Sequence, residues 1–460
     1  MIGRLAVRSL TAHPVRSAIL AAGFGTGVAV MAILLGVAEV VLDQAQSPAL
    51  VGGGDVVIRL DPRLPARLLL SGTLQSDTLR PRIRIAAPFE TSSLYLLRKG
   101  GATRVAARGG IPSLERALAD KETADVEAWS DSAADLVWNQ DTPEQVLKHI
   151  DRFHPIPDAP DWADSWAEWL YFNGHAANAR FYLTFLVGPP LETGRRPAGV
   201  RLQLERNGHV EIFGTSAELT SEEVMRAPDL TIGASSVRLE GMRYRIHLDL
   251  AGERRRTLTG DLTIEASAGR IVPPLELSGA RGWRSGYVVP VTSGSLYGAL
   301  KIGSEDLDLA GGTGYHDHNW GFWKGVSWQW GQVQHDNLSL VFGRVFPPRE
   351  AADPERIPGF VGVLGPDGPL GFATDVRITE EGDEGGRPRA ISVRAHGASL
   401  DLDLRFDVAS ALTTRMAQGP AGGLDFLQLR GQYTVSGRAA DRQIAFSAPG
   451  TAETFRGRQP

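Results

Sequence analysis

One short run, Gly314 to Gly321, holds most of the side chains that could do chemistry. It reads Gly-Tyr-His-Asp-His-Asn-Trp-Gly and so places a carboxylate, two imidazoles, a phenol, an amide and an indole between two glycines. Side chains of a β-strand alternate between the two faces of a sheet. A strand here would have one face made of Tyr315, Asp317 and Asn319, and a second face made of His316, His318 and Trp320.

Two kinds of chemistry are open to this run. A carboxyl group kept protonated by apolar surroundings can act as a general acid, and Asp317, with Tyr315 beside it, is the catalytic candidate. The alternative for Asp317 is a structural role, capping backbone N–H groups. His316 and His318, with His335 further along, could bind a metal ion. No carboxylate is evident as a third ligand, so hydrogen-bonded histidines are favoured and no metal is predicted.

Aromatic residues gather around this run. Eight of the ten tryptophans lie between residues 162 and 330, with groups at 162–169 and 320–330. Aromatic clusters beside polar side chains are typical of an apolar pocket with a few orienting groups, although tryptophans also fill cores and close barrel ends. The residues predicted to line a substrate pocket are Trp169, Tyr171, Asn319, Trp320, Trp328, Trp330, His335 and Glu168.

Whether Glu168 can line the pocket depends on the face of its strand on which it lies. In the segment Glu168–His175 the two end residues would point to opposite faces of a strand, so only one of them could approach Asp317.

The elements that must position these residues are β-strands almost throughout, from about Asp161 onward. Residues 200–205 and 210–213 flank Asn207-Gly208, a two-residue hairpin signal. Residues 243–250 and 400–408 alternate apolar and polar side chains, as half-buried antiparallel strands do. The stretch is too long for one eight-stranded barrel, so we predict two tandem antiparallel β-domains, at 158–308 and 309–460.

Residues 44–157 mix strand-like runs, such as Ser93–Leu97, with helical ones. A helix is predicted from Ser113 to Asp120. Another follows the cap and proline signal Asp141-Thr142-Pro143 and ends near Phe153. We interpret 44–157 as a small mixed α/β linker segment.

The N-terminus predicts a membrane anchor over residues 1–43. Ala18–Ala38 carries no charged residue and is long enough, as a helix, to span a bilayer. Arginines precede it and acidic residues follow, which predicts a single-pass helix in the cytoplasmic membrane with the bulk of the chain on the extracytoplasmic side. A cleaved signal peptide is the alternative, but no A-x-A pattern follows the apolar run.

Residues 1–58 resemble the first transmembrane segment of MacB/FtsX-type ABC-transporter permeases. The likeness lies in Arg8-Ser-Leu-Thr-Ala-His13-Pro14-Val-Arg16, the Gly-rich apolar span and Asp43-Gln-Ala. It implies an anchor that could dock on ABC-transporter components, not transport by this chain.

Composition excludes several function classes. A formal net charge of −5, with no extended basic patch, argues against nucleic acid as a partner. The chain has no cysteine, so disulfides, thiolate metal sites and a cysteine nucleophile are excluded. No phosphate loop or dinucleotide fingerprint is present, and no cofactor is predicted.

Four motifs carry a family resemblance over about residues 160–455. They are Glu168-Trp-Leu-Tyr-Phe-Asn-Gly-His, Gly286-Tyr-Val-Val-Pro, Leu296-Tyr-Gly-Ala-Leu and the run from Gly314 to Gly321. Together they resemble the AttH-type, hydroxyneurosporene-synthase-like family, which includes carotenoid 1,2-hydratases and fungal pericyclases. The resemblance implies two lipocalin-like β-barrels with a hydrophobic ligand pocket, in which Tyr315 and Asp317 match the residues implicated in protonating an isoprenoid double bond.

This sequence departs from the hydratases at two places. His318-Asn-Trp-Gly stands where they have a Ser-Asn-Glu-Gly-like run, and Tyr287-Val-Val-Pro stands where they have a His-x-Trp pair. The expected function is a membrane-anchored, cofactor-free, acid-assisted hydration, isomerisation or cyclisation of an isoprenoid or lipidic substrate. The alternative is a non-catalytic, lipocalin-like carrier of a hydrophobic small molecule, associated with an ABC transporter.

Overall fold

The structure is a computed structural model of the 460-residue chain. It describes residues 142–458 except for gaps at 177–178, 367, 384–386, 398 and 418–422, and it describes 80–98 and 101–118. Before residue 142 it also describes 14–15, 57–58, 70, 73, 130–132 and 135. The chain forms two compact units, residues 1–74 with 78–140, and residues 75–77 with 141–460.

The first unit contains one hairpin and one short helix. Strands β1 (Phe89–Arg98) and β2 (Gly101–Gly110) pair antiparallel, after the 3₁₀ turn η1 (Arg80–Arg82). Helix α4 (Pro112–Ala117) follows, where the sequence predicts a helix. Within the described part of the chain, no helix is long and apolar enough to span a bilayer. The predicted membrane helix, residues 18–38, lies outside the described residues.

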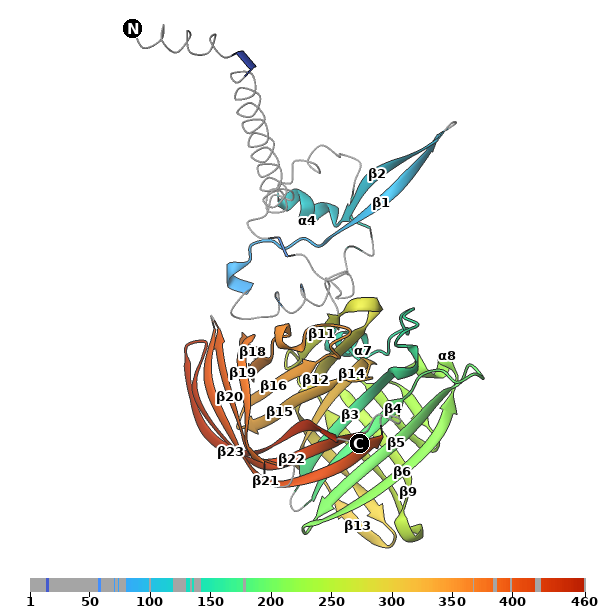
Figure 1. The fold of residues 1–460 in the computed structure, drawn as a ribbon, viewed down its shortest axis with the longest axis vertical. Helices are drawn as coiled ribbons and strands as arrows, with labels where there is room; N and C mark the ends of the chain where they lie inside the picture. Colours follow the sequence, from blue (N-terminus) through green and yellow to red (C-terminus); the bar gives the residue numbers. More distant parts are fainter. Residues whose placement is uncertain are drawn as a thin grey trace. The chain divides into compact units, whose positions relative to one another are not determined.

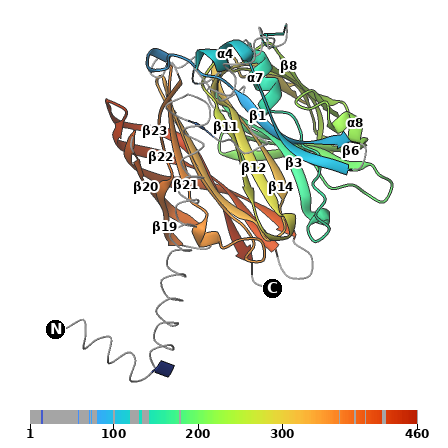
Figure 2. The ribbon, with the colours of Figure 1, turned by 90° about the horizontal axis from the view of Figure 1, so that it is seen from above.

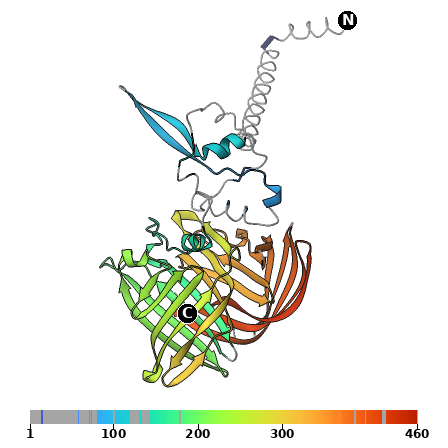
Figure 3. The same ribbon diagram turned by 180° about the vertical axis from the view of Figure 1, so that it is seen from behind.

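The second unit begins with α7 (Pro143–Ile150), at the predicted helix start. Thr142 and Gln145 form a capping box, in which the Gln145 amide N–H donates to Thr142 Oγ1 at 3.2 Å and Thr142 N–H to Gln145 Oε1 at 2.8 Å. The helix ends at Ile150, and its C-cap residue is Asp151. It lies at one end of the first large sheet (Figures 1 and 3).

Twelve strands form that first sheet, all paired antiparallel. They are β3 (Trp166–Ala176), β4 (Ala179–Val187), β5 (Arg196–Arg206), β6 (His209–Leu219), β7 (Leu230–Ile232), β8 (Ser235–Glu240), β9 (Arg243–Gly252), β10 (Thr257–Glu265), β11 (Val272–Ser278), β12 (Arg284–Ile302), β13 (Glu305–Asp308) and β14 (Gly312–Phe322). The path β10-β12-β14-β3-β4-β5-β6-β9 returns on itself because β9 also pairs with β10. The sheet is therefore nearly a barrel (Figure 1).

Several predicted features of this sheet are confirmed. The β5–β6 hairpin turns at Asn207 and Gly208, whose φ values of 51° and 76° are those that an Asn-Gly turn supplies. Strand β9 alternates exposed and buried residues as its sequence predicts. Short helical turns connect the strands: η2 (Ala163–Ser165), α8 (Ser221–Val224), η3 (Glu253–Arg255) and η4 (Ala280–Gly282).

Nine strands form the second sheet. They are β15 (Ser327–His335), β16 (Leu338–Phe346), β17 (Phe360–Gly365), β18 (Gly368–Ala373), β19 (Asp375–Asp383), β20 (Pro388–Gly397), β21 (Leu400–Ala417), β22 (Gly423–Ala439) and β23 (Arg442–Arg458), with η5 (Pro354–Arg356) before β17. Their order is β18-β17-β16-β15-β23-β22-β21-β20-β19, and no pairing of described residues joins β18 to β19. This sheet is strongly curled (Figure 2) but has two free edges.

The all-β main body of two antiparallel sheets is thus confirmed, with one near-barrel and one curled open sheet where two barrels are predicted. Strand β14 belongs to the first sheet. The change from one sheet to the next therefore falls after Phe322, somewhat later than the boundary predicted at 308/309.

Both sheets are packed with their own side chains. Fully buried residues such as Phe172, Leu202 and Tyr244 fill the first sheet, and one apolar cluster that includes Val333, Phe342 and Leu404 fills the second. These interiors are cores of the kind that stabilise a fold by apolar burial. The inside of each curled sheet is therefore a packed core and not the hydrophobic cavity that the resemblance implies.

The outer face of β3 and β14 instead packs against the second sheet. Trp330 Nε1 in β15 donates to Tyr315 Oη in β14 at 3.0 Å, and Gln428 Nε2 in β22 donates to Tyr171 Oη in β3 at 3.3 Å. In β15 and β22, alternate residues such as Val333 and Leu427 enter the core of the second sheet. Their neighbours along the strand are therefore left to meet the first sheet.

Candidate functional site

Strand β14 carries the candidate site, with ionisable side chains on both of its faces. The predicted alternation is confirmed: Tyr315 and Asp317 face the second sheet, whereas His316 and His318 face the interior of the first. Both faces are buried, because a sheet covers one and the near-barrel encloses the other. This explains why so polar a strand is almost entirely inaccessible to solvent.

The face toward the second sheet is an acid cluster around Asp317. In register, Asp317 lies opposite Tyr171 on β3. Asn319 Nδ2 donates to Asp317 Oδ1 at 2.6 Å, and the Asp317 side chain is 4% exposed. Tyr315 is held by the indole of Trp330. Asp317 is therefore a carboxyl group positioned by polar neighbours in a site that excludes bulk water.

Glu453 on β23 adds a second, partly buried carboxyl group to this cluster. Burial raises the pKa of Glu453 to about 7, although hydrogen bonds from Tyr171, Trp328 and Gln428 oppose the rise. Burial and the nearby Glu453 charge raise the pKa of Asp317 well above its ordinary value, opposed in part by Tyr315 and Asn319. Because the charge of Glu453 disfavours ionisation of Asp317, Asp317 keeps its proton to a higher pH than an isolated carboxyl group does.

An aromatic cluster flanks the acid pair on one side. Trp169 packs against Trp323 with ring centroids 4.6 Å apart, and Trp328 packs against Phe455 at 4.0 Å. Phe426 completes the group at 5.0 Å from Phe455. Because β3, β15, β22 and β23 all contribute, the cluster joins the two sheets beside the acid pair. Most of these rings are only partly buried.

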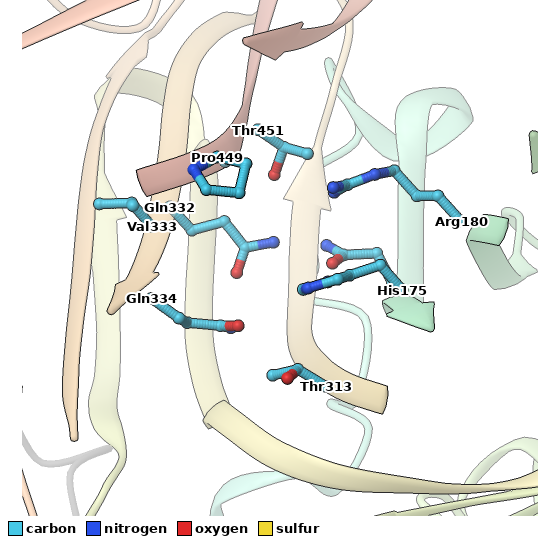
Figure 4. Close-up of a pocket in the computed structure, with 10 residues that line it drawn as sticks. His175, Arg180, Thr313, Gln332, Val333, Gln334, Pro449 and Thr451 are labelled. Carbon is cyan, nitrogen blue, oxygen red and sulfur yellow. The ribbon is translucent and has the colours of Figure 1, made fainter. Parts of the chain in front are cut away.

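A polar hollow lies on the other side, two residues further along the same strands. Its volume is about 20 Å³, room for roughly one water molecule. Gln332, His175 and Arg180 are among the side chains that point into it (Figure 4). His175 is exposed to solvent, and the positive charges of Arg180 and Arg430 lower its pKa. The Oε1 atom of Gln332 is buried without a hydrogen-bond partner in the structure.

The opposite face of β14 takes part in a network of three imidazoles and two carboxylates. His316 Nε2 lies 2.9 Å from Asp151 Oδ2, and His318 Nδ1 lies 3.1 Å from Asp151 Oδ1. His318 Nε2 is 3.0 Å from Glu168 Oε1, which His154 Nδ1 approaches to 2.7 Å. The network fixes the segment after α7 to β3 and β14.

The protons of this network follow from its acceptors. His316 also has Nδ1 at 2.9 Å from the Tyr171 carbonyl oxygen, so both rings on β14 face acceptor oxygens at both nitrogens. His318 donates to both carboxylates when its ring carries two protons. Burial alone would lower the pKa of His318, but its bonds to Asp151 and Glu168 raise that pKa to about 9. Asp151, despite burial, has a pKa lowered to about 2 by the two histidines.

The structure brings most predicted pocket residues to the acid-cluster side. These residues are Tyr315, Asp317, Asn319, Trp169, Tyr171, Trp328 and Trp330. Glu168 and Trp320 lie on the opposite face, because each differs by an odd number of positions from Tyr171 or Asp317. His335 joins neither group; it stacks on Phe446 at 4.5 Å and does not approach His316 or His318.

Sequence reasoning did not identify Glu453, Gln428, Asp151 or His154. Glu453 and Gln428 lie in the last two strands, where the alternation of polar and apolar residues predicts an ordinary solvent-facing side. Asp151 lies in the last turn of the helix predicted to end near Phe153, whereas the structure ends that helix at Ile150 and makes Asp151 its C-cap. A carboxylate third partner for the histidines was therefore present in the chain, but on a distant segment.

No protein-family model matches the sequence, and no curated protein sequence matches it. Among solved structures, a putative AttH from Nitrosomonas europaea is 15% identical, with a TM-score of 0.41 over 66% of this chain and 98% of that chain. Kievitone hydratase from Nectria haematococca is 14% identical, with a TM-score of 0.43 over 65% of this chain and 93% of that one. CghA, in complex with Sch210972, is 13% identical, with a TM-score of 0.41 over 69% and 95%.

An AttH-type protein is thus among the structures to which this chain is similar, as the sequence motifs predict. At such low identities and TM-scores the likeness carries no information about substrate or reaction. No comparison supports the resemblance of residues 1–58 to transporter permeases.

Proposed function

We propose that this protein is a cofactor-free acid catalyst that hydrates, isomerises or cyclises an apolar unsaturated substrate at the contact between its two sheets. The observation that carries the proposal is the pair of Asp317 and Glu453, in which Asp317 is buried against Asn319 and has its pKa raised by burial and by the Glu453 charge. A structural carboxylate would be ionised and paired with a cation, as Asp151 is. This pair has no cationic partner among the bonds that position it.

The chemistry follows from the proton on Asp317. A carboxylic acid O–H transfers its proton to one carbon of a C=C bond, so that a C–H bond forms and the other carbon becomes cationic. Water then adds to the cation, and the proton it releases returns to the carboxylate. Loss of a different proton to the carboxylate gives isomerisation. Attack by a second double bond forms a ring and a new cation, and loss of a proton from that cation to the carboxylate completes cyclisation. Each outcome restores the acid without a redox partner.

The surroundings suit each participant in this reaction. The faces of Trp169, Trp328 and Phe455 offer an apolar surface beside the acid and can stabilise a developing cation. The polar hollow on the other side, at Gln332 and His175, is a place from which water can approach. Since the hollow is small, a substrate enters only if the two sheets move apart there. The predicted membrane helix at residues 1–43 would hold the site where apolar substrates partition.

Turnover of an acyclic isoprenoid alkene by the full-length protein tests the proposal. Hydration adds 18 mass units to the product, whereas isomerisation or cyclisation changes chromatographic retention at constant mass. We expect Asp317→Asn to lower the rate by about a hundredfold or more, in line with the usual contribution of a general acid. Glu453→Gln removes the partner charge and should lower it less.

Asp401→Asn is the matched control, because Asp401 is an exposed carboxylate paired with His396 on the surface of the second sheet. Its rate should equal that of the unaltered protein. If a bound alkene is recovered chemically unchanged, whether or not Asp317 is present, the protein is a carrier and the proposal is wrong.

A further inference from the structure

The network inside the first sheet contains a set of metal-ligand side chains that the proposed reaction does not use. His154, Glu168 and His318 each offer one ligand atom, and all three atoms lie within 4.8 Å of one another. They come from three separate segments, the loop after α7, β3 and β14. Two imidazoles with one carboxylate form a donor set typical of zinc and of other divalent transition metals.

The spacing of the donor atoms fits an ion with little movement. Glu168 Oε1 lies 2.7 Å from His154 Nδ1 and 3.0 Å from His318 Nε2. Tetrahedral ligands at about 2.1 Å from zinc are about 3.4 Å apart, so these donor atoms would separate by roughly half an ångström to admit the ion. The same atoms are within hydrogen-bond distance of one another in the structure.

A second layer of contacts orients these ligands. The other ring nitrogen of His318 bonds Asp151, the carboxylate–histidine arrangement that usually supports a metal-bound imidazole. Asp151 is itself held by His316. The ring of His154 stacks on Trp320, with centroids 4.1 Å apart and planes 20° apart. Each ligand ring is therefore fixed before any ion arrives.

Burial and charge also favour a cation at this position. The side chains of Glu168 and His318 are fully buried, whereas that of His154 is 31% exposed and gives an ion a path from solvent. The two buried carboxylates, Asp151 and Glu168, need positive charge to balance them. A divalent cation would supply that charge.

We propose that His154, Glu168 and His318 bind one divalent transition-metal ion, with Asp151 orienting His318, at the end of the first sheet next to α7. The ion would have three protein ligands and an open position on the side of His154. This site lies on the opposite face of β14 from Asp317, so the proposal is independent of the proposed reaction.

Zn²⁺ and Co²⁺ are the probes for this site. The full-length protein, purified without a polyhistidine tag and stripped with a chelator, should take up one Zn²⁺ per chain by elemental analysis. The ion should raise the midpoint of thermal unfolding by several degrees, and bound Co²⁺ should give visible absorption bands. His154→Ala and Glu168→Gln should each weaken Zn²⁺ binding by at least tenfold.

His396→Ala is the matched control, because His396 forms a similar 2.7 Å pair with Asp401 on the surface. It should leave binding unchanged. If Glu168→Gln does not fold, His154→Ala still tests the metal site, because the side chain of His154 is partly exposed. Zn²⁺ that neither stays bound nor shifts unfolding overturns the proposal, and so does binding that is equally tight in His154→Ala.

Discussion

At the scale of single residues, one strand brings carboxylates into two opposite ionisation states. Glu168 and Asp151 lie beside imidazoles, and their pKa values are lowered in spite of burial. Burial raises the pKa values of Asp317 and Glu453, and the Glu453 charge adds to the rise at Asp317. Since Asp151, Glu168 and Asp317 are all buried, the charged partner decides the outcome for these three groups. An acid able to donate a proton therefore exists only on the side of the second sheet.

The raised pKa of Glu453 predicts a pH-dependent stability. The folded protein keeps this proton until the pH nears 7, whereas an unfolded chain loses it near the ordinary glutamate value of 4.5. Because the folded state binds the extra proton, the free energy of unfolding falls as pH rises through this window, by roughly 3 kcal/mol. Denaturant titrations across pH should show this fall in the unaltered protein and a flatter curve in Glu453→Gln.

Asp401→Asn serves as the control here as well, since its exposed carboxylate should not change the slope. If Glu453→Gln and the unaltered protein have the same pH dependence, Glu453 is ionised in the folded state.

At the scale of elements, glycine leaves room for a large aromatic side chain where β12 pairs with β14. Gly286 on β12 pairs in register with Trp320 on β14, and a Cβ at Gly286 would lie 2.4 Å from the indole. Trp320 needs that space to lie against His154. The Gly286-Tyr-Val-Val-Pro motif is thus explained locally, by the room it gives to the Gly314–Gly321 run.

Gly286→Ala should therefore destabilise the protein by about 1–3 kcal/mol through overpacking, and it should weaken Zn²⁺ binding because Trp320 no longer fixes His154. Chemical denaturation and Zn²⁺ titration measure the two effects. Gly199→Ala is the control, because a Cβ there meets only ordinary contacts, the nearest atom at 3.5 Å. Equal stability of the two variants would show that the indole can shift freely.

The elements themselves were largely predictable, because each depends on local pattern. The Asn207-Gly208 turn, the alternation of β9 and the capping signal before α7 all follow from the sequence. Strands β18 and β19 follow each other directly in the sequence, divided after Ala373, and yet they pair with different neighbours. No local signal fixes such a division, because it depends on which strand is available to pair.

At the scale of the whole second unit, the acid site exists only because two sheets meet. Its parts come from β3, β14, β15, β22 and β23, and the sequence cannot state which far strand covers Asp317. The alternation within Gly314–Gly321 predicts two faces, but it does not identify Asp151 or Glu453 as their partners. Pairings across such long sequence separations follow from packing.

Trp330 provides a test of how strongly this contact holds the two sheets together. It is 7% exposed, donates to Tyr315 Oη, and packs on Tyr287 and Phe360 with centroids 5.0 and 5.3 Å away. Trp330→Phe keeps a ring but loses the hydrogen bond, which should cost about 1 kcal/mol, whereas Trp330→Ala loses both, at about 3–5 kcal/mol. Denaturation followed by tryptophan fluorescence and by circular dichroism should give coincident curves in the unaltered protein, since neither sheet can expose the face around Tyr315 and remain stable. Two separated transitions would instead mean that each sheet is stable alone, and that the acid pair can open to solvent without unfolding.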